Sequence, residues 1–145
     1  MARNIGSVAT FEKSIADWID RAESGFEIVV ANTVTKTANA IVDLSPVDTG
    51  RFKANWQITA NSPAQQSLNE YDQTGGQTKT YLARQARAVA NSKATSVIYI
   101  TNRLDYAARL EYGASNQAPA GVLGVVQARL GRYFQEAVEE ARRAI

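Results

Sequence analysis

The stretch that decides the fold is SPVDTGRFKANWQITA, residues 45–60. Its second residue, Pro46, disfavours helix at the residue before it and so ends the helical pattern that precedes the stretch. The Asp-Thr-Gly triplet at 48–50 predicts a tight turn, because a short carboxylate accepts backbone N–H groups two residues further on and glycine adopts positive φ. Apolar and polar side chains then alternate from residue 52 to residue 60, which predicts a half-buried strand over 52–60.

Two amphipathic helices are predicted before this stretch. Apolar residues recur at steps of three and four over residues 8–22, the pattern of a helix with one buried face. Ser24 and Glu27 have the spacing of a capping box, in which the two side chains satisfy free N–H groups at a helix start. We therefore expect the first helix to end before Ser24 and a second helix to run from there to Pro46.

The rest of the chain predicts few strands and several helices. Residues 61–80 are almost wholly polar and read as a long loop, which in a compact domain is usually functional or disordered. Gly113 is placed to end a helix in the left-handed conformation. Four elements are expected: a helix at 81–91, a strand at 97–101 antiparallel to 52–60, a two-turn helix at 105–112 and a long amphipathic helix at 122–145.

This order of elements predicts an α+β fold, with the N-terminal helices and the long C-terminal helix packed on a small antiparallel sheet. A chain of 145 residues is long enough for one domain with its own core and too short for two ordinary ones. We expect a single domain over 1–145, with a polar functional loop at 61–80.

The composition excludes much of the chemistry that enzymes use. The chain contains no cysteine and no histidine, which removes disulfide frameworks, Cys/His zinc sites, thiol nucleophiles and Ser-His-Asp arrangements. It also lacks a Gly-rich phosphate loop. We therefore expect no catalytic residues, no metal and no cofactor. No stretch approaches the roughly 18 to 20 apolar residues that span a bilayer, so no membrane partner is expected.

Charge is spread unevenly, although the net charge is only +2. Residues 1–50 carry four basic and seven acidic side chains, residues 51–109 carry eight and three, and residues 110–145 carry four and four. A basic middle segment can attract a polyanion, which makes a small nucleic-acid-binding module the alternative function. The interleaving of basic and stacking aromatic residues that marks a nucleic-acid reader is not present, so a solvated face with modest positive potential is favoured.

Two polar groups could in principle carry chemistry, and both are better explained structurally. The group of Asp43, Asp48, Arg51 and Lys53 could bind a metal or carry out acid–base catalysis. The Asx turn at Asp48 accounts for it more simply, with an interface role for Arg51 left open. The second group is Tyr106, Arg109, Glu111 and Tyr112. We expect both tyrosine rings to complete the core and Glu111 to pair with Arg51 or another arginine. Charge pairs along the C-terminal helix are expected to be a solvated face.

Two separated motifs carry a resemblance to a known family. The first is SPVDTGRF at 45–52 followed by Asn55-Trp56, and the second is LEYGAS at 110–115, with Asn102 and Tyr106-Ala107 before it and Gln117-Ala118-Pro119 after it. In this order and about 60 residues apart, they resemble the tail-completion (neck) proteins of long-tailed double-stranded DNA bacteriophages, the minor tail protein Z-like group. The opening residues 6–13 are also similar, so the resemblance covers nearly the whole chain except 61–80 and the last turn or two.

This resemblance implies a structural protein of the virion without enzymatic activity. It implies a ring, expected to be a homohexamer, at the head-proximal end of the tail, which completes the tail and helps join it to the head. The implied partners are further copies of the chain, tail terminator or tail tube proteins and head-tail connector proteins. DNA would pass through the ring without being specifically bound, and the protein would be made in the host cytoplasm and reside in the tail-neck region.

The resemblance also assigns roles to particular residues. The expected motif and scaffold residues are Pro46, Val47, Asp48, Thr49, Gly50, Arg51, Trp56, Tyr106, Glu111, Tyr112 and Gly113. The loop at 61–80 holds Lys79 against Glu70 and Asp72, and a negative loop is poorly suited to grip phosphate. We therefore expect the loop to contact protein on assembly, with Leu68 and Tyr71 as its interface anchors. Because its composition cannot bury enough apolar surface to order the loop by itself, we also expect it to be mobile in the isolated subunit.

Overall fold

The structure is a computed structural model that describes residues 5–145, with side-chain surroundings from residue 8 onward. Gly6 and Ser7 of the family-like opening therefore have no described side-chain environment. The elements, in order, are α1 (Ile5–Leu44), α2 (Arg51–Ala54), β1 (Trp56–Ala60), α3 (Gly76–Asn91), β2 (Ile98–Asn102), α4 (Ala107–Glu111), α5 (Leu123–Gln127) and α6 (Leu130–Ala144). The predicted α+β class is confirmed.

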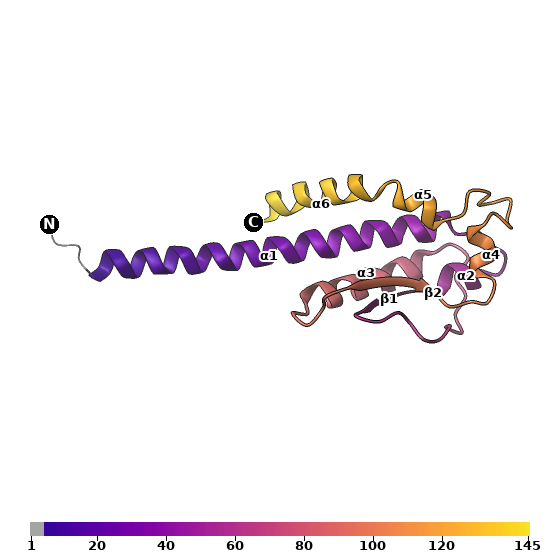
Figure 1. Cartoon of the computed structure of the whole chain (residues 1–145), viewed down its shortest axis with the longest axis horizontal. Helices are drawn as coiled ribbons and strands as arrows, with labels where there is room; N and C mark the ends of the chain where they lie inside the picture. The colour runs from indigo at the N-terminus through magenta and orange to yellow at the C-terminus, as the bar shows by residue number, and fades with distance from the viewer. Residues whose placement is uncertain (1–4) are drawn as a thin grey trace.

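Helix α1 is the spine of the molecule. In Figure 1, α6 runs along one side of its C-terminal half, while α3 and the sheet lie on the opposite side. Its N-terminal part extends well beyond the body and past the end of α6. The long C-terminal helix therefore packs mainly on α1, and α3 packs on both α1 and β1.

The prediction of two N-terminal helices is wrong, because α1 continues for 40 residues through the expected capping box. Ser24 and Glu27 lie within the helix. Gly25 weakens a helix intrinsically by about 1 kcal/mol relative to alanine. It is buried here, however, and a Cβ built on it would lie 3.1 Å from Cδ1 of Ile145. Tertiary packing at this point favours a continuous helix over the local signal for a break.

The core lies on both sides of the C-terminal half of α1, toward α3 and the sheet on one side and toward α5 and α6 on the other. Leu82 and Ala86 of α3 are fully buried, as are Val42 of α1 and Val122 and Val126 beside α6. Trp56 and Ile58 of β1 complete this cluster. The alternation along β1 therefore points the apolar face that carries Trp56 and Ile58 into the core, as predicted.

The strand is shorter than predicted, because residues 51–54 form one helical turn. β1 pairs with β2 in antiparallel register from Trp56 opposite Asn102 to Ala60 opposite Ile98. Before it, Nδ2 of the fully buried Asn55 donates to the carbonyl oxygen of Arg51 at 2.7 Å and closes the turn. A buried amide, bonded to the backbone, thus overrides the period-two pattern at its beginning.

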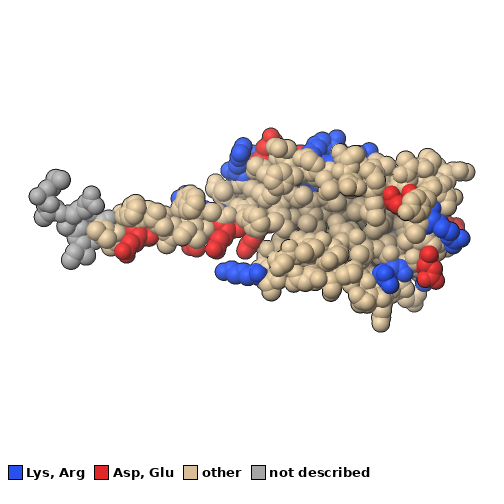
Figure 2. Space-filling view, in the orientation of Figure 1, with Lys and Arg blue, Asp and Glu red and all other residues tan. Residues whose placement is uncertain are grey.

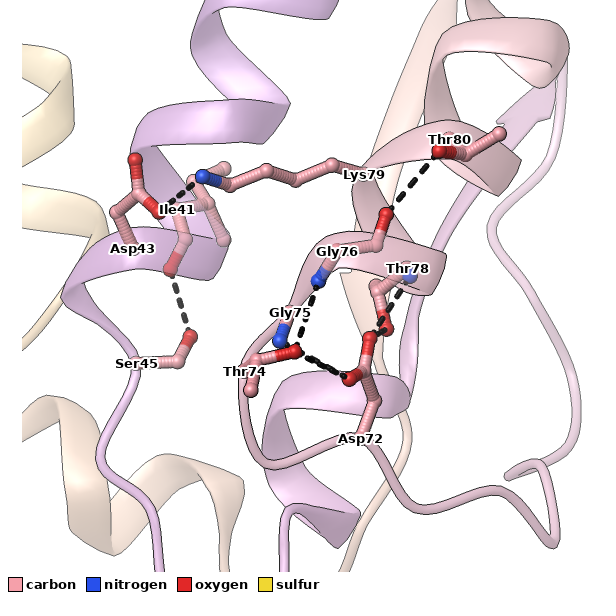
Figure 3. Close-up of polar contacts among 10 residues, drawn as sticks. All are labelled: Ile41, Asp43, Ser45, Asp72, Thr74, Gly75, Gly76, Thr78, Lys79 and Thr80. Carbon is pink, nitrogen blue, oxygen red and sulfur yellow. Dashed lines mark hydrogen bonds and ion pairs between the residues drawn. The ribbon is translucent and has the colours of Figure 1, made fainter.

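Helix α3 begins at Gly76, five residues earlier than predicted, because Asp72 caps it. Its carboxylate accepts hydrogen bonds from the backbone N–H groups of Gly75 (3.0 Å) and Thr78 (2.9 Å) and from the hydroxyl of Thr78 (2.8 Å) (Figure 3). Burial alone would raise the pKa of Asp72, but these bonds outweigh it and lower the pKa below the ordinary value of 3.8. Free N–H groups at a helix start are satisfied in this way.

The remaining loop, residues 61–75, is held against the body by hydrogen bonds. The backbone N–H of Leu68 donates to Oδ1 of Asn55 at 2.6 Å, and the backbone N–H of Asp72 donates to the carbonyl oxygen of Gly50 at 3.0 Å. Gln57 donates to the carbonyl oxygen of Gln66. These hydrogen bonds argue against the expected mobility of the loop. Polar groups of the body hold the loop in place, although its few apolar side chains could not do so alone.

The C-terminal region is also more divided than predicted. Residues 105–112 contain only the short helix α4, and the predicted helix over 122–145 is split into α5 and α6 with a break at residues 128–129. Gly113 and Gly121 both have positive φ, of 87° and 77°. The predicted role of Gly113 at the end of the α4 segment is therefore confirmed.

We expect Ser45→Ala to lower the free energy of unfolding by about 1 to 3 kcal/mol. The buried Ser45 hydroxyl donates to the carbonyl oxygen of Ile41 at 2.6 Å and accepts from Nε1 of Trp56 at 2.9 Å, so its loss leaves a buried indole N–H without a partner. Chemical denaturation measures the change. Ser14→Ala, which removes a similar side-chain bond on the exposed part of α1, is the control and should be neutral. Equal stability of both variants would contradict this role.

Candidate functional site

The predicted turn after α1 depends on Gly50. Its φ is 87°, and a Cβ built on it would lie 2.6 Å from the backbone of both Asp72 and Gln73. The carbonyl oxygen of Gly50 accepts hydrogen bonds from the backbone N–H groups of Ala54 and Asp72, both at 3.0 Å. Both the conformation and the close approach of a second chain segment therefore require glycine.

The predicted Asx turn at Asp48 is wrong. The Asp48 side chain is exposed, and no hydrogen bond within the described part of the chain involves its carboxylate. The backbone N–H of Arg51 instead donates to Oγ1 of Thr49 at 3.3 Å. The hydroxyl of Thr49 can make this bond at the same spacing of two residues that a carboxylate would use, so the aspartate remains free to face outward.

The two motif regions meet at Val47 and Gln117, which lie 70 residues apart in the sequence. The Gln117 side chain accepts from the backbone N–H of Val47 and donates to its carbonyl oxygen, each at 2.9 Å. A side-chain amide thus pairs with one backbone residue as a neighbouring strand would. The same junction encloses a cavity of about 200 Å³, lined by both motifs.

Aromatic rings support this junction from within. The rings of Phe52 and Trp56 meet edge to face with centroids 5.5 Å apart, and Tyr106 lies 6.3 Å from Phe52. Phe52 and Trp56 are buried, and Tyr106 is half-buried. Asn102 at the end of β2 also donates to the carbonyl oxygen of Phe52 at 2.9 Å.

Tyr112 does not complete the core, contrary to our expectation. Its side chain is 90% exposed. The reason is local, since α4 ends at Glu111 and Tyr112 is its C-cap, before the positive-φ Gly113 turns the chain. Tyr112 is therefore a large aromatic side chain that contributes little packing to its own subunit.

Glu111 is a helix cap and does not pair with arginine as expected. Its carboxylate accepts hydrogen bonds from the backbone N–H groups of Val122 (2.9 Å), Leu123 (2.7 Å) and Gly124 (3.0 Å) at the start of α5. Partial burial alone would raise the pKa of Glu111, but these three donors outweigh it and lower the pKa below its ordinary value of 4.5. The second motif therefore fixes the direction of the chain into the C-terminal helices.

The polar group of Asp43, Asp48, Arg51 and Lys53 is dispersed. Asp43 pairs with Lys79 of α3 (Figure 3), and Lys53 is buried, with its aliphatic carbons beside Gly75. Arg51 is half-buried at the edge of the junction cavity, and its Nε has no hydrogen-bond partner among the described residues. Arg51 is thus the one member of this group with an unused donor at the junction.

The predicted interface anchors lie beside a second hollow. Leu68 is half-buried and Tyr71 is 55% exposed. Both line a cavity of about 300 Å³ between the 61–75 loop and the first turns of α3, together with Thr78 and Tyr81. The structure brings these two residues together but separates them from the junction of the motifs.

Sequence reasoning missed the polar side chains that join segments distant in the chain. The strand pattern places Asn55 on the outward face, and the sequence alone gives Asp72 only a charge and Gln117 only a position beside the second motif. Their signal is the residue type, because short amide and carboxylate side chains often bond to the backbone in turns. Which backbone group each would bond to depends on the tertiary fold.

Over residues 5–145 the structure holds no group of three or more His, Cys, Asp and Glu side chains placed to bind a metal ion. None of the described helices is both long and apolar enough to cross a membrane. Comparisons with protein-family models, curated proteins and solved structures find no match to this chain. A functional argument therefore depends on the motifs and the surfaces of the chain itself.

We expect Gly50→Ala to lower the free energy of unfolding by about 2 kcal/mol or more, since alanine adopts this left-handed conformation at a cost of about 1 to 2 kcal/mol and its methyl group also meets backbone. Asp48→Ala is the matched control from the same turn, and it should change stability by about 0.5 kcal/mol or less because its carboxylate makes no bond. Thermal and chemical denaturation measure both. A larger loss of stability for Asp48→Ala than for Gly50→Ala would show that Asp48 does form the Asx turn.

The stability contributed by Glu111 should depend on pH. Because its pKa is lowered in the folded state, this contribution is fully present above the ordinary value of 4.5 and is lost as the pH falls through the lower folded-state pKa. The difference in melting temperature between the wild type and Glu111→Gln should therefore be largest above pH 4.5 and shrink in more acidic buffer. A difference that does not vary with pH would mean that ionisation of Glu111 does not stabilise the cap.

Proposed function

We propose that this protein is a structural component of the virion of a long-tailed double-stranded DNA bacteriophage. It forms a ring, expected to be hexameric, at the head-proximal end of the tail, completes the tail and helps join it to the head. Its partners are further copies of itself, tail terminator or tail tube proteins, and head-tail connector proteins. It acts by shape and contact, without catalysis, and DNA passes through the ring without specific binding.

The observation that carries this proposal is the double hydrogen bond between Gln117 and Val47. The two motifs that resemble the neck proteins are distant in sequence, and this contact makes them one surface. Gly50, Glu111 and Gly113 fix the backbone around it. Residues that resemble a family and also form one rigid unit support a shared structural role.

The surface of this unit offers groups that the fold itself does not use. Tyr112 is almost fully exposed, and the Asp48 carboxylate faces outward. Exposed aromatic side chains are enriched at protein interfaces. We infer that the junction of the motifs is a contact surface toward a neighbouring virion protein.

The alternative, a nucleic-acid-binding module, has weaker support. Its basic segment at 51–109 loses two cations to the fold, because Lys53 is buried and Lys79 pairs with Asp43. The polar loop within that segment uses Asp72 to cap α3 and presents Leu68 and Tyr71 beside a hollow. Apolar anchors next to a cavity fit a protein partner better than a phosphate backbone.

The test is deletion of the gene from the phage that encodes it, with complementation from a plasmid. We expect the deletion to yield separate DNA-filled heads and tails in electron micrographs, and wild-type protein to restore joined particles. Tyr112→Ser should reduce joining by about tenfold or more without lowering the melting temperature, since hot-spot side chains of this type contribute about 2 kcal/mol.

Val97→Ser, at another exposed apolar position outside both motifs, is the matched control and should restore joining fully. Normal joined particles from the deletion would overturn the neck assignment. Binding of the purified protein to DNA with a steep dependence on salt would favour the nucleic-acid alternative.

A further inference from the structure

Most of the N-terminal part of α1, residues 8–26, is an apolar helix face without a partner among the described residues of its own subunit; only its last turn, at the buried Gly25, meets Ile145. We call this segment the arm; in Figure 1 most of it extends past the end of α6, away from the body. Phe11, Trp18 and Phe26 are 66%, 63% and 69% exposed, and Val8, Ile15 and Ile19 are close to half exposed. An exposed apolar stripe of this length marks an interaction surface.

The stripe has the geometry of a helix that packs against another helix. Phe11, Ile15 and Ile19 form one row at steps of four residues. Trp18 and Phe26, with Ala22 between them, form a parallel row. Rows at this spacing are the ridges that enter the grooves of a facing helix. The arm is therefore suited to lie along a second helix.

Charge narrows the choice of partner. Over residues 5–27 there are five acidic and two basic side chains, a net of −3, whereas residues 28–145 carry thirteen basic and nine acidic, a net of +4. Figure 2 shows acidic side chains along one edge of the arm and basic ones at the end of α6 nearest to it. Two arms would repel each other, because both are acidic. An anionic membrane is also a poor partner, because helices that bind such membranes carry basic residues on their polar face. The body of a second copy has the complementary charge.

The outer face of α6 has the matching surface. Its inner face buries Tyr133, Ala137 and Ala141. Leu130 and Phe134, 40% and 49% exposed, form with the half-buried Val138 the row directly beside this buried face, and this row is what we call the outer face. Arg142 and Arg143 end the helix, close to where an acidic arm would pass. This face offers apolar contact and positive charge together.

Gly131 gives this face a hole. A Cβ built on Gly131 has nothing within 4 Å, so no contact in the subunit requires glycine there, although glycine weakens an exposed helix. With Phe134, Gln135 and Val138, it forms the set of four helix positions that surrounds one inserted side chain in knobs-into-holes packing. An aromatic side chain of the arm can enter such a hole closely.

We propose that the arm of one copy packs along the outer face of α6 of a second copy, with an arm aromatic seated over Gly131. Six side chains of this kind leave roughly 600 Å² of apolar surface on the arm, and the two faces together reach the roughly 1,000 Å² that a specific interface needs. Arm and α6 are different surfaces, so the contact is head-to-tail and generates a ring if it closes. This inference deepens the proposed function. Only the closure of the contact into a ring rests on that function; the contact between arm and α6 does not.

Cysteine cross-linking tests the contact directly, because the chain has no cysteine of its own. Ala22→Cys and Ser14→Cys place a cysteine at two positions along the arm, and Gln135→Cys places one at the edge of the hole on α6. Single variants are mixed in pairs at high concentration and treated with a short bismaleimide. We expect a covalent dimer from at least one arm variant mixed with the α6 variant, about tenfold more abundant than dimers of either variant alone.

Dimers from the arm variants alone would show arm-to-arm pairing and overturn the proposal, as would the absence of any cross-link. Gly131→Ala adds a readout that a structural role would not produce. Alanine should raise the melting temperature of the subunit, because its methyl group enters open space, yet weaken association by about tenfold by filling the hole. Gly124→Ala, another exposed helical glycine, is the matched control and should leave association unchanged.

The two proposals fail separately. A ring that still assembles when Phe11 and Trp18 are both changed to serine would overturn the arm contact and leave the neck assignment intact. These serine variants should remain folded, since both side chains lie outside the core. Joined particles from a phage that lacks the gene would overturn the neck assignment, whereas the cross-link between arm and α6 would still stand.

Discussion

The rest of the structure depends on the close backbone contact at Gly50. Its left-handed conformation turns the chain out of α1, and its carbonyl oxygen holds both α2 and the returning loop through Ala54 and Asp72. That loop contact in turn places the Asp72 carboxylate at the start of α3. Because a side chain at this position would collide with backbone, a single residue with no side chain couples the end of α1, the entry to the sheet and the capping of α3.

The same region connects the fold to the proposed function. The Gln117 amide bonds to Val47 directly after α1, and Glu111 uses its carboxylate to direct the chain into α5 and α6. The first and second motifs are thereby joined to each other and to the C-terminal helices. Tyr112 is left exposed on this unit, where the proposed role in the neck would place a contact surface.

Helix α1 has two tasks that make different demands on its sequence. Its C-terminal half buries side chains against α3 and α6, whereas the arm keeps an apolar stripe exposed. The arm side chains therefore contribute little to the core of their own subunit. The unfilled hole at Gly131 on α6 fits the same account, since a glycine that weakens an exposed helix becomes favourable once a second chain packs over it.

The sequence by itself determined the α+β class, the antiparallel strand pair, the end of α1 shortly before Pro46 and the turns at Gly50 and Gly113, because periodicity and backbone restrictions act locally. Only the tertiary structure decided that α1 continues through Ser24, since the buried Gly25 packs against Ile145. It also decided the partners of Asn55, Asp72, Glu111 and Gln117 and the exposure of Tyr112. A polar side chain can bond to any backbone group within reach, and the groups within reach are set by how the whole chain packs.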